Sequence, residues 1–132
     1  MRQPAARHRE IVMTYTAPVE QIEFILNKVV SFPQLAGTEL FAEATPETTS
    51  AILTEAGKLA GEVIAPVNRA GDLTPAALEN GKLRSSPGYA DAFRALAEGG
   101  WIGVSANPEY GGMGLPQALV AIQFDMQVDE DP

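Results

Sequence analysis

Three glycines fall within residues 111–114, Gly-Gly-Met-Gly, directly before a stretch that is predicted to be a helix from about residue 115. Backbone N–H groups at the start of a helix can bind phosphate or carboxylate. The loop matches neither a dinucleotide-binding fingerprint nor a P-loop, because no strand precedes it and no lysine follows it. Two interpretations stay open: an anion site and, as the favoured one, glycines that are needed for steric reasons in a tight loop.

Acidic residues near the end of the chain form a second candidate site. Asp125 and Asp129 are four residues apart on one predicted helix, and Glu130 and Asp131 follow. Such a cluster could hold a divalent cation, but the spaced oxygen ligands of an EF-hand loop are missing. A solvated helix end is the favoured interpretation.

Two carboxylate pairs, Glu20 with Glu23 and Glu55 with Glu62, lie on the polar faces of predicted helices. General acid–base catalysis requires a carboxyl group that is held in a cleft. Nothing in the sequence pattern places these four carboxylates in one, so we predict no catalytic role for them.

The aromatic residues, the single histidine and the absence of cysteine give no further catalytic site. Trp101 and Tyr110 flank the glycine loop and could cover a flat ligand, although aromatic core plugs are commoner. The chain has no cysteine, and its one histidine, His8, lies in a polar leader. Thiolate metal sites, disulfides and a serine–histidine triad are therefore excluded or strongly disfavoured. The sequence predicts no catalytic, cofactor-binding or metal-ligating residue.

Charge is unevenly distributed along the chain. The formal net charge is −8, while the leader 1–12 carries Arg2, Arg7 and Arg9 against Glu10, which leaves −10 on the remaining residues. An acidic body repels phosphate backbones and anionic lipid, so we expect neither nucleic-acid binding nor membrane docking. No apolar run approaches the length of a membrane-spanning helix, and we expect a cytoplasmic protein.

The leader 1–12 lacks hydrophobic periodicity, and we expect it to be disordered. It could be a short basic arm or a targeting segment. The favoured interpretation is that Met13 is the natural start, because a well-patterned segment begins there.

Hydrophobic spacing predicts about four main helices and no large sheet, which places the chain in the all-α class. The first helix covers about 18–32, with Pro18 in its first turn and Pro33 ending it. Its apolar stripe consists of Ile22, Ile25, Leu26, Val29 and Val30.

The second helix has the clearest start, because Thr45 is a good N-cap and a proline follows it. Pro66 is expected to end or kink this helix, and Gly71 to cap it. Gly57 and Gly61 lie one turn apart on one face. Either another helix approaches closely there, or the glycines are only tolerated; both interpretations carry equal weight. The apolar stripe consists of Ile52, Leu53, Ala56, Leu59, Ala60, Val63, Ile64 and Val67.

Residues 72–86 read as a connector. Asn80-Gly81 is a tight-turn signal, and it predicts a small hairpin near 78–83. A third helix follows over 87–98, with Ser86 as its N-cap and a glycine pair at its end. The apolar face of that helix consists of Tyr89, Phe93, Leu96 and Ala97.

The fourth helix runs from about 115 toward 130, and its apolar residues point in nearly every direction. A helix of this kind requires burial on all sides, which three other helices are not expected to supply. We therefore expect exposed apolar surface and self-association. The residues concerned include Val120, Phe124 and Val128.

Several motifs in the correct order resemble the N-terminal helical domain of the acyl-CoA dehydrogenases. Residues 98–104 (EGGWIGV) and 108–116 (PEYGGMGLP) match one family motif, and 62–72 (EVIAPVNRAGD) matches the end of a long family helix. Residues 15–19 (YTAPV) and 79–81 (ENG) fit a longer subgroup, which includes enzymes that act on a sulfur-containing acyl-CoA. The resemblance covers about 13–128.

The resemblance implies an oxidoreductase of fatty acid metabolism. In this family FAD lies between a middle β-domain and a C-terminal helical domain. A glutamate of the C-terminal portion removes the α-proton of the acyl-CoA, and the β-hydride passes to flavin N5. An electron-transfer flavoprotein is the usual oxidant, and homo-oligomers are common. No catalytic or FAD-binding residue of the family has a counterpart in this sequence.

The expected domain organisation is a leader over 1–12 and a family-type helical domain over 13–132, truncated before the middle β-domain. We expect such a chain to be inactive alone and to bind no FAD alone. Two alternatives stay open: a stand-alone helical protein-interaction module, and one subunit of a split flavoenzyme.

Overall fold

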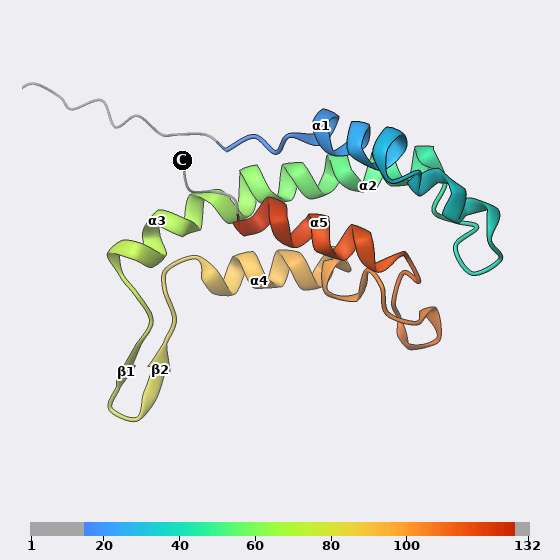
Figure 1. The fold of residues 1–132 in the computed structure, drawn as a ribbon. Coiled ribbons are helices and arrows are strands. Elements are labelled where there is room, and N and C mark those ends of the chain that lie inside the picture. The colour runs from blue at the N-terminus through green and yellow to red at the C-terminus, as the bar shows by residue number, and fades with distance from the viewer. Residues whose placement is uncertain (1–14, 129–132) are drawn as a thin grey trace, which may run out of the picture.

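The computed structural model describes residues 15–128, and these residues form an all-helical fold apart from one small hairpin (Figure 1). The predicted all-α class is confirmed. Within the described range, no helix combines the length and the apolar character that a membrane crossing needs. The elements are α1 (Val19–Phe24), α2 (Pro46–Leu59), α3 (Ala65–Leu73), β1 (Ala77–Glu79), β2 (Lys82–Arg84), α4 (Tyr89–Glu98) and α5 (Gln117–Val128).

Helix α2 begins as the sequence predicted. Thr45 has extended backbone geometry, and its hydroxyl oxygen accepts a hydrogen bond of 3.2 Å from the Thr48 N–H. This bond satisfies one of the free amide groups at the helix start. The predicted N-cap is therefore confirmed.

The second helix was predicted to end or kink at Pro66, and of these two outcomes the end was wrong. After α2 the backbone hydrogen bonds take π-helical spacing over Ala60–Ile64, and α3 follows without a break. Pro66 lies in the first turn of α3, where the preceding π-helical turn has already changed the hydrogen-bond pattern around its missing N–H. Gly71 is not a cap either, because α3 continues to Leu73 and Thr74 is its C-cap.

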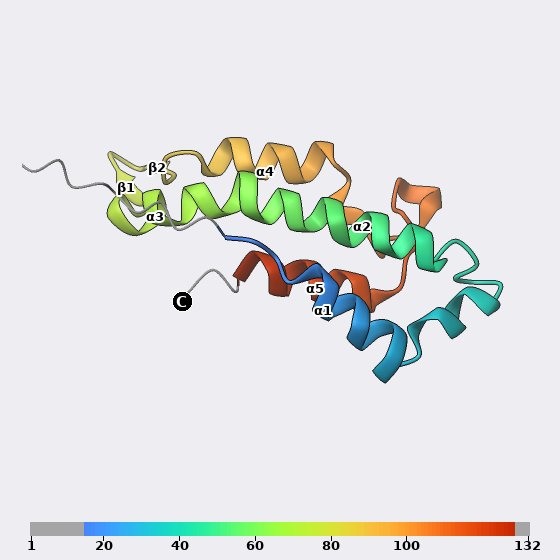
Figure 2. The same ribbon diagram turned by 90° about the horizontal axis from the view of Figure 1, so that it is seen from above.

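The core lies where α1 and α5 pack against α2 (Figure 2). Alanines on α2 and on the π-helical turn after it let the neighbouring elements come close, and leucines fill the remaining space. The buried core residues are Leu26, Phe32, Ala44, Leu53, Ala56, Ala60, Val104, Leu115, Leu119 and Met126.

The first helix is confirmed in position but not in its buried face. A π-helical turn, Ile25–Val29, extends α1, and the left-handed backbone of Ser31 (φ 52°) ends it before Pro33, while Pro18 is the N-cap. Of the predicted stripe, only Leu26 is buried. The exposed members are Ile25, Val29 and Val30.

The two helical glycines of α2 and its extension mark a close approach, as one of the two interpretations proposed. A Cβ at Gly61 would lie 2.8 Å from the carbonyl oxygen of Tyr15, and one at Gly57 would lie 3.1 Å from Cγ2 of Val19. The approaching chain is mainly the extended segment before α1, not another helix. Glycine lets this segment lie directly on the helix backbone.

The predicted hairpin is confirmed. Its strands pair Ala77 with Arg84, Leu78 with Leu83 and Glu79 with Lys82. Both turn residues have positive φ, 51° at Asn80 and 75° at Gly81, which is the geometry of a type I′ turn. The hairpin projects away from the helices at one end of the molecule (Figure 1).

Helix α4 ends at the predicted glycine pair, with Gly100 in the left-handed region (φ 76°). Its predicted N-cap, Ser86, was wrong. Gly88 is the N-cap with φ 83°, and no side chain accepts a hydrogen bond there. A Cβ at Gly88 would lie 2.6 Å from Cγ1 of Val67, so this turn can pack on α3 only because the residue is glycine.

Candidate functional site

The glycine loop leaves little capacity for an anion. The amide N–H groups of four consecutive residues, 112–115, donate to carbonyl oxygens of residues 103–107 at 2.9–3.1 Å. An anion bound by this loop would need free N–H groups, and these four are already used. The geometry supports the steric interpretation of the loop.

Each glycine of this loop is required for its own steric reason. A Cβ at Gly112 would collide with the backbone carbonyl of Ala106, where the loop folds back on itself. Gly111 and Gly114 have φ values of 86° and 64°, which favour glycine. Together they allow the reversal that brings Leu115 into the core ahead of α5.

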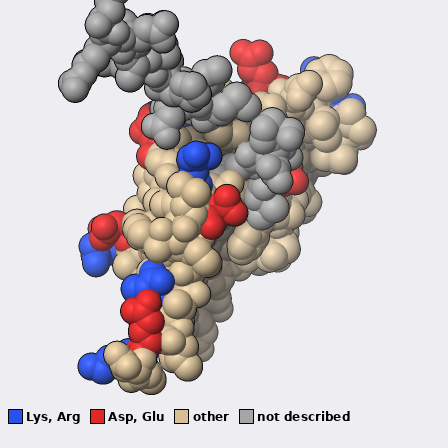
Figure 3. All heavy atoms as spheres, turned by 90° about the vertical axis from the view of Figure 1, so that its left-hand side faces the viewer, with Lys and Arg blue, Asp and Glu red and all other residues tan. Residues whose placement is uncertain are grey.

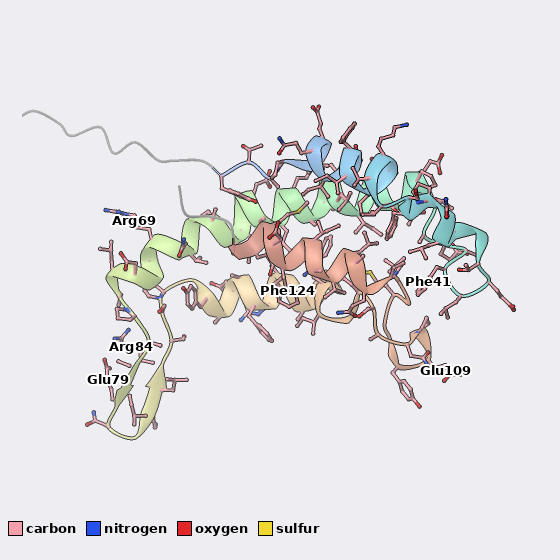
Figure 4. All side chains as sticks on the ribbon, in the orientation of Figure 1. Phe41, Arg69, Glu79, Arg84, Glu109 and Phe124 are labelled. Carbon is pink, nitrogen blue, oxygen red and sulfur yellow. The ribbon has the colours of Figure 1, made fainter. Side chains whose placement is uncertain are left out.

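The two aromatic residues beside the loop do not share a site. Trp101 is half-buried and packs against the core, as expected of a core plug, whereas Tyr110 is 86% exposed. In Figure 4 the neighbouring Glu109 projects from this loop, at the opposite end of the molecule from Glu79 and Arg84 of the hairpin. The labelled charged side chains therefore do not converge on one point.

The carboxylate pairs named above do not form acid–base dyads. Glu55 accepts a hydrogen bond of 2.6 Å from Lys58, and both side chains are more than half exposed. This hydrogen bond, together with the charge of Glu55, raises the pKa of Lys58 above its ordinary value. Glu62 and Glu20 are exposed, and only Glu23 is half-buried.

The acidic cluster is only partly within the described residues. Asp125 is exposed on α5, while Asp129, Glu130 and Asp131 lie outside the described range, as does His8. Within residues 15–128, no group of three or more histidine, cysteine or acidic side chains is placed to hold a metal ion. Three of the four carboxylates of the candidate cation site thus lie outside the described residues, and the interpretation as a solvated helix end stays a prediction.

Charged side chains do not form a broad patch of one sign on the face shown in Figure 3, where acidic and basic groups alternate. Three ion pairs are found among the described residues, each on the surface: Lys58 with Glu55, Arg84 with Glu79, and Arg94 with Asp91. This distribution offers no continuous electrostatic footprint for a phosphate backbone on that face.

The feature that best fits a binding surface is a groove of about 500 Å³ between α3, α4 and the end of α5. None of its side chains is a carboxylate, a histidine or a cysteine, so it can hold apolar groups but offers no acid–base pair. The lining residues are Ile64, Val67, Asn68, Tyr89, Ala92, Phe93, Leu96 and Gln127.

One polar group in the groove is unsatisfied within the described residues. The side-chain nitrogen Nε2 of Gln127 is buried and has no hydrogen-bond partner there. Buried donors in proteins normally have an acceptor.

The sequence did not predict this groove, because the groove forms between helices and a linear pattern does not show which helices become neighbours. The signal was nevertheless present. Three of the eight lining residues, Tyr89, Phe93 and Leu96, belong to the apolar face predicted for the third helix. Phe93 is 63% exposed, so this face is not covered by the rest of the described chain.

Comparison with known proteins relates these observations to an enzyme family. No family model matches the chain. The chain is 38% identical over 109 residues to 3-methylmercaptopropionyl-CoA dehydrogenase from Ruegeria pomeroyi, a match that covers 83% of this chain. This chain is related to the acyl-CoA dehydrogenases. The predicted resemblance is confirmed, as is the subgroup, because the relative is named for a sulfur-containing acyl-CoA.

The same match covers 18% of the relative, so the chain spans about a fifth of the length of that acyl-CoA dehydrogenase. The motif residues 98–116 that first indicated the family lie at the end of α4 and in the glycine loop before α5. In this structure those residues shape the chain rather than present reactive groups.

Proposed function

We propose that this chain forms the N-terminal helical part of an FAD-dependent acyl-CoA dehydrogenase, which introduces an α,β double bond into an acyl-CoA thioester. The observation that carries the proposal is the 38% identity over 109 residues to the Ruegeria pomeroyi dehydrogenase. The all-helical fold agrees with the domain that the sequence motifs indicated.

In this proposal the chain supplies a wall and a docking surface, and other domains supply the flavin and the base. The groove between α3 and α4 is apolar and contains no acid–base pair. Phe124, on α5, is 59% exposed, which is a large exposure for a phenylalanine in a small helical domain. Surfaces of this kind support a helical part that is completed by further protein.

Further parts of the proposal come from the family resemblance. We assign acyl-CoA as substrate, FAD as cofactor and an electron-transfer flavoprotein as oxidant to the intact enzyme, and we place its homo-oligomer in the cytoplasm. The chain on its own is proposed to be inactive and to bind no flavin, because the family resemblance places the α-proton base and the flavin contacts in the later domains.

A chimaera tests the proposal directly. The aligned stretch of the Ruegeria pomeroyi enzyme is replaced by the matching residues of this chain, and flavin absorbance and oxidation of 3-methylmercaptopropionyl-CoA are measured. We expect a flavin-loaded, active protein. The same enzyme with the stretch deleted is the control, and we expect it to lose both flavin and activity.

A pair of variants in the chimaera tests the docking surface. Phe93→Asp places a charge on the apolar groove and should release flavin by disturbing the domain contact, whereas Arg94→Ala, one position away on the exposed side, should not. An inactive chimaera that is folded and flavin-free would contradict the proposal. Acyl-CoA oxidation by the 132-residue chain alone would contradict the assignment of the chemistry to other domains.

A further inference from the structure

The tip of the β1–β2 hairpin carries a reactive pair of residues. Asn80 and Gly81 are both exposed, and a Cβ built at Gly81 would touch nothing within 4 Å. We propose that Asn80 is a site of spontaneous covalent modification in this protein, at which the side-chain amide is lost and an aspartyl or isoaspartyl residue forms. This inference does not depend on the proposed function.

The reaction uses only the chain and water. The backbone nitrogen of Gly81 attacks the side-chain carbonyl carbon of Asn80, the C–N bond of the amide breaks, and ammonia leaves. The product is a five-membered cyclic imide. Water then opens one of its two C–N bonds, which gives either an aspartyl residue at this position or a chain that continues through the side-chain carbon. The net change is one amide and one water converted to one carboxylic acid and one ammonia.

Only one of the four asparagines in the sequence has this arrangement. Asn27 and Asn68 lie inside helical segments, where the following residue is held by backbone geometry and carries a long side chain. Asn107 is followed by Pro108, whose nitrogen has no hydrogen to lose. Glycine after Asn80 leaves the attacking nitrogen unhindered, because no Cβ shields it.

The hairpin gives this pair little protection. Its strands are three residues long, and Leu78 and Leu83, which face each other across it, are each 75% exposed. An isolated two-stranded hairpin is marginally stable in water, and segments with few buried contacts open at low free energy. Opening frees the turn from its positive φ values, so the nitrogen of Gly81 can reach the side chain.

Modification would prevent the hairpin from closing again. The isoaspartyl form adds one backbone atom, whereas the two-residue turn sets the register that pairs Leu78 with Leu83. The new carboxylate also lies next to Glu79, whose ion pair with Arg84 at 2.8 Å spans the same strands. Loss of this pairing should accompany the chemical change.

The test is incubation of the 132-residue chain for several days at physiological temperature and mildly alkaline pH, followed by peptide mass spectrometry. Asparagine is a thermolabile residue, and we expect a gain of about one dalton at Asn80 first among the four asparagines. Conversion should be slower at mildly acidic pH, since the attacking nitrogen must lose its proton. Isoaspartate is confirmed by enzymatic methylation of the peptide.

Two variants and one control make the outcome decisive. Gly81→Ala should slow conversion roughly ten-fold even where the hairpin opens, because a Cβ hinders the attack. Asn80→Asp should abolish the mass change at this peptide and leave the others unaltered. Conversion in urea gives the rate of the open chain. If the native chain stays unmodified while the urea sample converts, or if Asn27 or Asn68 converts first, the proposal is wrong.

Discussion

Helices α2 and α4 both carry an apolar stripe at helical spacing, yet they have opposite environments. On α2, Leu53 and Ala56 are 1% and 3% exposed, because α1 and α5 cover them. On α4, Tyr89 and Phe93 are 42% and 63% exposed. The residue of α4 that is buried is Ala92, beside the predicted face rather than in it.

This difference shows that a hydrophobic stripe can face either the core of its own chain or an open groove. The pattern indicates that a face avoids water, but it does not indicate which part of a protein covers it. For α2 the cover is present among the described residues. For α4 the stripe borders an open groove, in agreement with the proposal that further protein completes this side.

Truncation of the two stripes should have the largest and most unequal effects. We expect Leu53→Ala to lower the free energy of unfolding by about 2–5 kcal/mol, because it leaves a cavity in the core. Phe93→Ala on α4 should change it by less than about 0.5 kcal/mol, since most of the ring is in water. Urea unfolding followed by circular dichroism measures both.

An equal loss of unfolding free energy in Leu53→Ala and Phe93→Ala would contradict the difference in burial between α2 and α4. It would indicate that a second copy of the chain covers α4 in solution. Sedimentation of the Phe93→Ala variant and of the unaltered chain distinguishes that case. If a second copy covers α4, the substitution should weaken the dimer, and the variant should sediment with a lower mass than the unaltered chain.

The close approach on the back of α2 gives the next prediction. Gly61→Ala gains about 1 kcal/mol in helix propensity, but its Cβ would meet the Tyr15 carbonyl, and overpacking costs about 1–3 kcal/mol. We expect a net loss of stability. Gly57→Ala meets a movable Val19 methyl instead and should be more stable than Gly61→Ala. The reverse order in thermal unfolding would contradict the observed contacts.

The helix starts differ as well, with a smaller consequence. Thr45→Ala removes the hydroxyl that accepts from Thr48, and we expect a loss of about 1 kcal/mol in the same urea assay. Thr45→Ser keeps an acceptor and serves as the matched control. Helix α4 has no such side-chain cap to lose. A loss in the serine variant as large as in the alanine variant would show that the methyl group matters instead.

The smallest effects on unfolding free energy are expected from the ion pairs, because α2 and α4 each carry one exposed pair. Lys58 pairs with Glu55 on α2 at 2.6 Å, and Arg94 pairs with Asp91 on α4 at 2.9 Å, all of them exposed. Glu55→Gln and Asp91→Asn should leave unfolding unchanged within error, because solvent screens such pairs.

The raised pKa of Lys58 gives that pair a pH dependence with a definite sign. Its contribution is present below the ordinary lysine pKa near 10.5 and is lost as the pH rises through the higher folded-state value. Across this alkaline range, urea unfolding of the unaltered chain and of Glu55→Gln should therefore differ by no more than the error, and a clear difference would show that the exposed pair contributes more than expected. A loss on the acidic side of neutrality in the unaltered chain would have to come from other groups.

Local signals were sufficient for much of the fold. Thr45 before a proline predicted the start of α2, Asn80-Gly81 predicted the hairpin turn, and the glycine pair at 99–100 predicted the end of α4. In each case a residue type satisfies a nearby backbone requirement, so neighbours in sequence contain the information. The family motif at 98–116 was read correctly for the same reason, since its residues follow one another from the end of α4 through the glycine loop.

Where those signals failed, a distant contact decided. Ser86 was a reasonable cap, but Gly88 permits a turn that packs on Val67 of α3, and the helix starts later. Pro66 was expected to end or kink its helix, which continues past this residue after a π-helical turn at Ala60–Ile64.

By itself the sequence determined the all-α class, the local turns and caps, and the relation to the acyl-CoA dehydrogenases. These follow from side-chain preferences and motifs that act over a few residues. Only the tertiary structure decided that the glycine-loop amides are used internally, that the segment at Tyr15 lies on Gly61, and that the stripe of α4 borders a groove. Whether a side chain is buried depends on the residues that surround it in space. Those residues come from distant parts of the sequence and become neighbours only when the helices pack together.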